Sequence, residues 1–330
     1  MLNMAGLKIP GKRLLSKYWD LKEANSTSDF PNLLANVMHK ILLDKFKGVN
    51  SPWRQYTLKG NLEDFKSHDR VILDEAPDLL EKEELAEGED STLGDHKYSI
   101  QLSTFDRRFT VSRQAIINDD LTALRRQPQR FGRSAGRTIA KKVVARLEGD
   151  GNTYDNKSLF NIADHNNFRA PTLTNDAAGI ELVAGMMTRI QQATDETGEK
   201  MGLQAKYLLV PPELEDTAMR IVNGTAFIPV TSSGGTTEVG KVKRLTPIVE
   251  PYFTSSSKFY VFADPQDAPV IEVGFLNGKE APDLLVQSAQ AIRVAGGQDE
   301  WGYDFDDMSF KVRLDLGTAL AYYQGVQRSG

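Results

Sequence analysis

The sequence predicts a soluble α+β fold with two subdomains, and three patterns indicate it. A long amphipathic helix follows a strand within residues 103–151. A strand of the buried type at 207–210 leads directly into a helix that begins at Pro211 and Pro212. Apolar and polar residues alternate over 310–316, which is typical of a strand with one buried face. The 330 residues are enough to bury a full core.

Composition and charge exclude several classes of protein. The 40% hydrophobic and 26% charged residues are ordinary for a soluble globular chain. A net charge of −5 argues against a general nucleic-acid binder, which is normally basic. Cysteine is absent, which excludes disulfides and thiol catalysis and fits a reducing compartment. The N-terminus has no apolar region like that of a signal peptide, and no apolar run is long enough to cross a membrane. We therefore expect a soluble protein that is cytosolic where it is made.

Residues 1–27 are expected to form an arm rather than a domain, because they carry several basic side chains and few bulky anchors. A helix is expected to follow. Ser28 or Asp29 can cap its start, and Pro31 suits its first turn. Gly48 is expected to end it. Its apolar residues recur with helical spacing: Leu33, Leu34, Val37, Met38, Ile41, Leu42 and Phe46.

The stretch 52–104 combines short strand-like pieces with a very acidic middle. Strands are expected at 53–58, 70–73 and 98–102. Between residues 74 and 90, nine acidic residues stand against one lysine, a local charge of −8. A long two-stranded excursion is marginally stable by itself. It is either a disordered acidic loop or a hairpin arm held by a basic surface, and that surface belongs either to the same chain or to another subunit.

The next stretch offers such a basic surface. A strand is expected at 105–112, followed by one long helix from about Pro128. The apolar residues of this helix recur every four positions: Phe131, Ala135, Ile139, Val143 and Leu147. A second stripe lies roughly opposite and consists of Arg126, Arg130, Arg133, Arg137 and Lys141. Residues 107–146 hold eleven basic and two acidic residues, a local charge of +9. The stripe is either a solvated basic face or a binding surface for something acidic.

The second half of the chain predicts a small α/β subdomain followed by more strands. A helix is expected from 175 to about 195, followed by the strand and helix described above. Residues 231–240 are rich in glycine, serine and threonine and indicate a surface loop. The later strands are expected at 245–250, 258–262, 270–275, 284–294 and 310–316.

Several motifs resemble reactive sites but are better explained otherwise. Residues 235–241 fit most of a phosphate-binding loop, yet Val242 stands where a magnesium-binding hydroxyl is needed, and a strand is expected next. The four histidines are scattered without zinc spacing. Two acidic clusters, at 119–120 and at 304–307, are better explained as caps and solvated turns. Gly132 and Gly136 indicate a close backbone approach to the long helix. No catalytic residue, cofactor or metal is expected.

Seven segments, taken together, resemble one known family. The chain is similar to the major head subunit of Mu-like tailed phages and prophages, which has the Hong Kong 97-type (HK-97-like) capsid fold. The matching segments run in order from residue 28 to near the C-terminus: SDFPNLLANVMHKILLDKF (28–46), FTVSRQAIINDDLTAL (109–124), YLLVPPELEDTAMRIV (207–222), VEPYF (249–253), FYVFADP (259–265), IEVGFLNGKEAP (271–282) and FKVRLDLGTALAYYQG (310–325). Residues 1–27 match least.

This resemblance implies a role for each part of the chain. The expected division is an N-terminal arm (1–51), an extended loop (52–104), a first part of the peripheral domain with its spine helix (105–154), an axial domain (155–265), and a second part of the peripheral domain with a C-terminal strand (266–330). The last ten or so residues are expected to rejoin the axial domain. Because the chain starts at Met1 without a fused protease domain, the resemblance implies no protease activity.

The implied function is structural. The chain is expected to assemble with itself, as hexamers and pentamers, into an icosahedral shell. The shell is expected to enclose double-stranded phage DNA and to contact it non-specifically. Scaffold, portal, decoration protein and maturation protease are further expected partners. The expected location is the virion capsid, with assembly in the host bacterial cytoplasm. Two rivals are a cargo-loading nanocompartment shell of the same fold and a nucleotide-binding enzyme that uses residues 235–242.

Two sets of residues are candidates for assembly contacts. The first pairs acidic side chains of the extended loop with the basic stripe of an adjacent copy: Glu81, Glu83, Glu84, Glu87 and Glu89 with Arg126, Arg130, Arg133, Arg137 and Lys141. The second is the basic arm, expected to face packaged DNA or a scaffold: Lys8, Lys12, Arg13 and Lys17.

Overall fold

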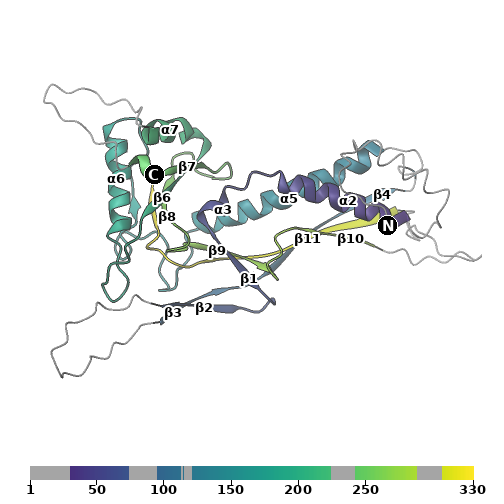
Figure 1. Ribbon diagram of the computed structural model, residues 1–330, viewed down its shortest axis with the longest axis horizontal. Coiled ribbons are helices and arrows are strands. Elements are labelled where there is room, and N and C mark those ends of the chain that lie inside the picture. Colours follow the sequence, from purple (N-terminus) through teal and green to yellow (C-terminus); the bar gives the residue numbers. More distant parts are fainter. Residues whose placement is uncertain (1–29, 74–94, 113, 115–120, 224–241, 288–306) are drawn as a thin grey trace, which may run out of the picture. The chain divides into compact units, whose positions relative to one another are not determined.

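A computed structural model describes residues 30–73, 95–112, 114, 121–223, 242–287 and 307–330. The chain forms two compact units. Unit 1 comprises Met1–Val49, Thr104–Arg137 and Glu280–Asp315, and unit 2 comprises Asn50–Ser103, Thr138–Lys279 and Leu316–Gly330. Helices and strands follow one another along the chain without a regular alternation, as expected for an α+β protein (Figure 1). No described helix is both long and apolar enough to cross a membrane.

Unit 1 is built around helix α2 and an aromatic core. Helix α2 (Phe30–Lys47) ends where Gly48 was expected to end it, and the Gly48 amide donates to the Asp44 carbonyl. Strands β4 (Ser103–Ser112) and β10 (Asp283–Val286) and the first part of β11 (Asp307–Leu320) belong to the same unit. The core residues of unit 1 are Met38, Leu42, Phe109, Val111, Met308, Phe310 and Val312.

Helix α5 (Leu121–Glu148) is longer than the sequence predicts and contributes residues to both units. A start near Pro128 was wrong, because the helix begins earlier and holds this proline in its interior. An interior proline costs roughly 3 kcal/mol of helix stability. The side chain of Pro128 is buried, so tertiary packing outweighs the local preference.

One sheet joins early and late strands of the chain. Strand β9 (Ile271–Leu276) pairs in parallel with β1 (Leu58–Leu62) and antiparallel with the end of β11. The strand order is β1-β9-β11-β10, and β4 also pairs with β11. The alternation expected in β11 is confirmed, since the apolar side chains from Phe310 to Leu316 are buried and the intervening ones are half-buried.

The expected strand at 53–58 was wrong. Residues Trp53–Tyr56 form helix α3, and β1 begins only at Leu58. The Thr57 hydroxyl donates to the Trp53 carbonyl at 2.8 Å. Trp53 and Tyr56, three residues apart, are both buried on one side of this turn. Burial of two aromatic side chains therefore decides the local structure.

Unit 2 contains a second sheet with order β5-β12-β8-β6-β7. Its central strand β8 (Phe259–Ala263) is buried along its whole length. Its neighbours are β6 (Ala205–Val210) and β12 (Val326–Ser329), and the outer strands are β5 (Phe168–Arg169) and β7 (Thr246–Val249). Helices α6 (Ala177–Gln191) and α7 (Glu215–Asn223) pack on this sheet with apolar side chains that include Ile180, Val183, Ile190, Ala218 and Ile221.

Unit 2 also holds a two-stranded antiparallel ribbon, formed by β2 (His68–Leu73) and β3 (Asp95–Ile100). Side chains on one face of this β2–β3 ribbon are exposed, whereas Arg70, Ile72, Tyr98 and Ile100 on the other face are half-buried or buried. The residues that join the two strands, 74–94, lie outside the described residues.

Candidate assembly surfaces

Helix α5 presents an apolar face and a basic face, as its sequence predicts. Ala135, Ile139, Val143 and Leu147 are buried, and Phe131 is half-buried. The ring of Phe109 stacks on Phe131 at 5.0 Å between centroids. The apolar side of the helix therefore belongs to the core of the chain.

The basic stripe on α5 lies outside the core. Arg126, Arg130, Arg133, Arg137 and Lys141 are all exposed. No ion pair joins any of the five to a carboxylate among the residues that the structure describes. The candidate partners Glu81, Glu83, Glu84, Glu87 and Glu89 lie outside the described residues, so their pairing with the stripe stays a prediction.

Gly132 and Gly136 mark the close approach that the sequence indicates. A Cβ atom on Gly132 would overlap with the Leu42 carbonyl of α2. A Cβ atom on Gly136 would lie 3.0 Å from the side chain of Val49. Two backbones of unit 1 therefore approach each other where glycine leaves room.

The remaining candidates lie mostly outside the described residues. These are Lys8, Lys12, Arg13 and Lys17 of the arm, residues 235–241 of the loop that resembles a phosphate site, and the acidic residues at 119–120 and 304–306. Val242–Arg244, directly after that loop, form a single 3₁₀ turn before β7. Such a short turn offers no extended helix N-terminus for phosphate.

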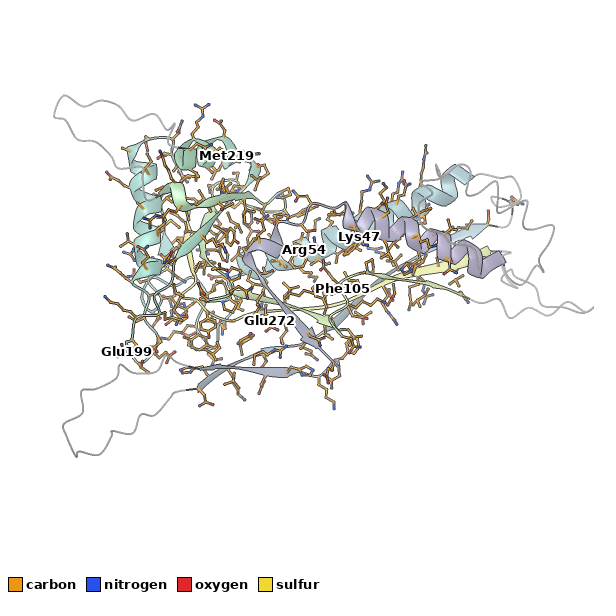
Figure 2. All side chains as sticks on the ribbon, viewed as in Figure 1. Lys47, Arg54, Phe105, Glu199, Met219 and Glu272 are labelled. Atoms are coloured by element: carbon orange, nitrogen blue, oxygen red, sulfur yellow. The ribbon has the colours of Figure 1, made fainter. Side chains whose placement is uncertain are left out.

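The end of the β2–β3 ribbon at His68 and Ile100 is called its root. A buried carboxylate holds the ribbon near this end. Glu272 of β9 has 2% exposure and is labelled in Figure 2. Its Oε1 atom lies 3.2 Å from Nη2 of Arg70 in β2. Its Oε2 atom accepts a 2.6 Å hydrogen bond from the Tyr98 hydroxyl in β3. Burial, followed by this hydrogen bond to Glu272, raises the pKa of Tyr98, so the hydroxyl stays a donor.

A second buried carboxylate lies where α3 meets the sheet of unit 2. Glu250 follows β7, is fully buried, and accepts a 3.2 Å hydrogen bond from the Tyr56 hydroxyl. Its other oxygen, Oε1, has no hydrogen-bond partner among the described residues. Burial raises the pKa of Glu250 to about 7, against the lowering effect of the hydrogen bonds from Tyr56 and the Tyr252 backbone.

His165 is one end of an aromatic stack in unit 2, in which Tyr323 lies between it and Tyr154. Its ring lies 3.8 Å from that of Tyr323 and nearly parallel to it. Its Nε2 atom lies 2.8 Å from Oδ2 of Asp155, and its Nδ1 atom lies 3.1 Å from the Leu159 carbonyl. Burial alone would raise the pKa of Asp155, but hydrogen bonds, first from His165, hold it below its usual range. Within the described residues no group of three or more His, Asp or Glu is placed to hold a metal ion.

Sequence patterns did not single out Glu272, Glu250 or His165. A signal was present for Glu272, since it is the one charged residue in the otherwise apolar run Val270–Leu276. Its partners Arg70 and Tyr98 stand far away in the chain, so only the fold brings the three together.

Comparisons with known proteins identify one family and one fold. Residues 97–329 match the family described as "Phage capsid protein". No curated protein matches the sequence. A solved structure from Gordonia phage Cozz has 12% identity and a TM-score of 0.52, covering 85% of this chain and 86% of that chain.

Two further solved structures are similar. One from Mycobacterium phage Bobi has 13% identity and a TM-score of 0.51, covering 85% of this chain and 90% of that chain. The capsid structure of Cyanophage P-SCSP1u has 10% identity and a TM-score of 0.50, covering 84% and 86%. At these identities the likeness concerns the fold alone.

Proposed function

The chain belongs to the phage capsid protein family, and we propose that its basic α5 stripe binds the acidic segment of a neighbouring copy during shell assembly. The protein is a structural major capsid protein of the Hong Kong 97-type fold, and it assembles with itself into the shell of a phage head. Its place is the virion capsid.

The exposure of the whole stripe carries this proposal. Five cations lie along one face of a helix, and none has a carboxylate partner among the described residues. An acidic segment with a local charge of −8 stands in the same chain, so every copy brings both surfaces to the assembly. Exposed ion pairs are worth about 0–1 kcal/mol each. The contact therefore sets the register between copies, while apolar contacts supply most of the affinity.

The finer assignments are part of the same proposal. Residues 52–104 act as the extended loop, α5 as the spine helix, and residues 155–265 as the axial domain of a Mu-like head subunit. Assembly takes place in the host cytoplasm with a scaffold, portal, decoration protein and maturation protease, and the shell holds double-stranded DNA by non-specific contact. Nuclease-protected DNA inside purified particles would separate this function from a cargo-loading shell.

The test is a charge reversal on the stripe. Combined replacement Arg130→Glu, Arg133→Glu and Arg137→Glu should leave the subunit folded by circular dichroism but abolish shells in electron micrographs. The matched control is Arg130→Lys, Arg133→Lys and Arg137→Lys, which keeps the charge and should still assemble. Adding Glu81→Lys, Glu83→Lys and Glu84→Lys to the reversed stripe should restore shells, because attraction returns. Normal shells from the reversed stripe alone would refute the contact.

A further inference from the structure

A row of three glycines crosses the sheet beneath the β2–β3 ribbon. Gly274 of β9 pairs with Gly60 of β1 on one side and with Gly317 of β11 on the other. Residues that pair directly across strands point to the same face of a sheet. The row therefore leaves a strip of this face without side chains.

The root of the ribbon occupies this strip. A Cβ atom on Gly317 would overlap with the Gln101 carbonyl, just after β3. A Cβ atom on Gly274 would lie 2.6 Å from Cδ1 of Leu62 and 3.1 Å from Cδ1 of Ile100. These side chains form a small apolar cluster of their own with Leu102 and Ala319. A close backbone approach thus fixes where the ribbon starts.

Glu272 lies on the same strip and supplies the polar part of the attachment. It stands two residues before Gly274, so both point to one face of β9. A Cβ atom on Gly60 would overlap with its carboxylate, so glycine at position 60 makes room for the charge. Arg70 reaches the carboxylate from β2 and also donates to the Asn61 carbonyl at 2.9 Å, while Tyr98 reaches it from β3. One carboxylate therefore holds both strands of the ribbon.

We propose that Glu272 is a positioning residue that fixes the direction of the β2–β3 ribbon and so makes successive copies of the capsid protein join at one angle. An apolar root alone would allow the ribbon to rock, because apolar contacts are non-directional. A buried charge held by two donors has one favourable geometry. The inference rests on the proposed role of the ribbon as the base of an arm that reaches a neighbouring copy.

The experiment uses the full chain with Glu272→Gln, Arg70→Gln, and both together. Glu272→Gln keeps the size of the side chain and removes its charge. In the unassembled subunit, amide hydrogen exchange over 68–73 and 95–100 should become about tenfold faster, as expected for the loss of a charge-assisted hydrogen bond. The double variant should exchange no faster than the single ones, because both remove the same contact. Shells from each variant should show a broadened diameter distribution in electron micrographs.

Lys97→Gln is the matched control. It breaks the 2.9 Å pair between Lys97 and Asp69, which lies on the exposed face of the same ribbon. This variant should give shells of wild-type diameter.

Three results from the variants would overturn the inference. Unchanged exchange in the ribbon would show that Glu272 does not hold it. Faster exchange in β8 as well would reveal a general structural role for Glu272. Uniform wild-type shells despite a loosened ribbon would exclude a positioning role. Failure of the wild type itself to form any shell would instead overturn the proposed function, and the positioning role with it.

Discussion

Glu250 and Glu272 are two buried carboxylates of the same unit in very different surroundings. Glu272 has a guanidinium and a phenol hydroxyl as partners, one on each oxygen. Glu250 has no cation beside it: its hydrogen bonds come from the Tyr56 hydroxyl and the Tyr252 backbone, and its Oε1 atom lacks a partner among the described residues. The pKa of Glu250 is raised to about 7 by burial. Burial beside a cation thus makes Glu272 an anchor. Burial without a cation makes Glu250 a group that titrates near neutrality.

The two carboxylates belong to two attachments that are held by different forces. The β2–β3 ribbon is held by charge and by glycines that let its backbone approach the sheet. Helix α3 is held by aromatic burial, since Tyr56 also lies 5.4 Å from Phe262 between ring centroids. Apolar packing holds α3 without a cation, whereas a guanidinium strengthens the directional contact at the ribbon.

The largest expected effect is a pH dependence that comes from Glu250. Its pKa rises on folding from an ordinary 4.5 to about 7, so the folded state binds the proton more tightly than the unfolded state. The stabilisation is complete below about pH 4.5 and is lost as the pH rises through about 7. Relative to Glu250→Gln, the wild type should lose about 3 kcal/mol of unfolding free energy between about pH 4 and pH 8.

Urea denaturation of both proteins across this range measures the effect of Glu250. The glutamine variant mimics the neutral acid and should be the more stable protein at about pH 8. Glu272→Gln is the counterpart, because it should lower stability at that same pH by breaking the pair with Arg70. Equal pH profiles for the wild type and Glu250→Gln would contradict the raised pKa.

A smaller effect is expected from adding one methyl group to the glycine row. In Gly317→Ala the new Cβ meets a backbone carbonyl, which cannot move away cheaply. The free energy of unfolding should fall by about 1–3 kcal/mol, and exchange in β3 should rise. Gly185→Ala in α6 is the control, because beyond the adjacent residues and the backbone of its own helix no atom lies within 4 Å of the added Cβ. It should raise stability by up to about 1 kcal/mol. Two alanine variants of equal stability would argue against the close approach.

The smallest effects are expected from removing the two phenol hydroxyls. Tyr56→Phe and Tyr98→Phe should each cost about 1 kcal/mol. Only Tyr56→Phe should move the titration of Glu250, and it should move it to higher pH, because the Tyr56 hydrogen bond lowers that pKa. NMR titration of the Glu250 side chain measures this shift. A shift caused by Tyr98→Phe instead would mean that the two carboxylates are coupled.

Prediction from the sequence works best for features that depend only on residues within one helix or strand. The four-residue spacing on α5 gives its buried face, and the alternation in β11 gives its buried side. Gly48 ends α2 as expected, because a helix end is a local event. The capsid family, too, is recognisable from short segments spread along the chain.

The sequence fails where local preference and distant contacts disagree. Pro128 indicates a helix start, yet its burial keeps it inside α5. Residues 53–56 look like a strand, yet burial of Trp53 and Tyr56 makes them helical. The basic stripe is exposed as its pattern indicates, but its partner stays a prediction, because the acidic segment lies outside the described residues.

The helix faces, the alternating strand and the charge separation can be derived from local sequence, because each depends on residues a few positions apart. The glycine row of Gly60, Gly274 and Gly317 follows from the fold instead, as does the carboxylate of Glu272 that Arg70 and Tyr98 share. These residues lie far apart in the chain, and the register of the paired strands brings them together. A shift of the β9 register by one residue would turn Glu272 to the opposite face of the sheet.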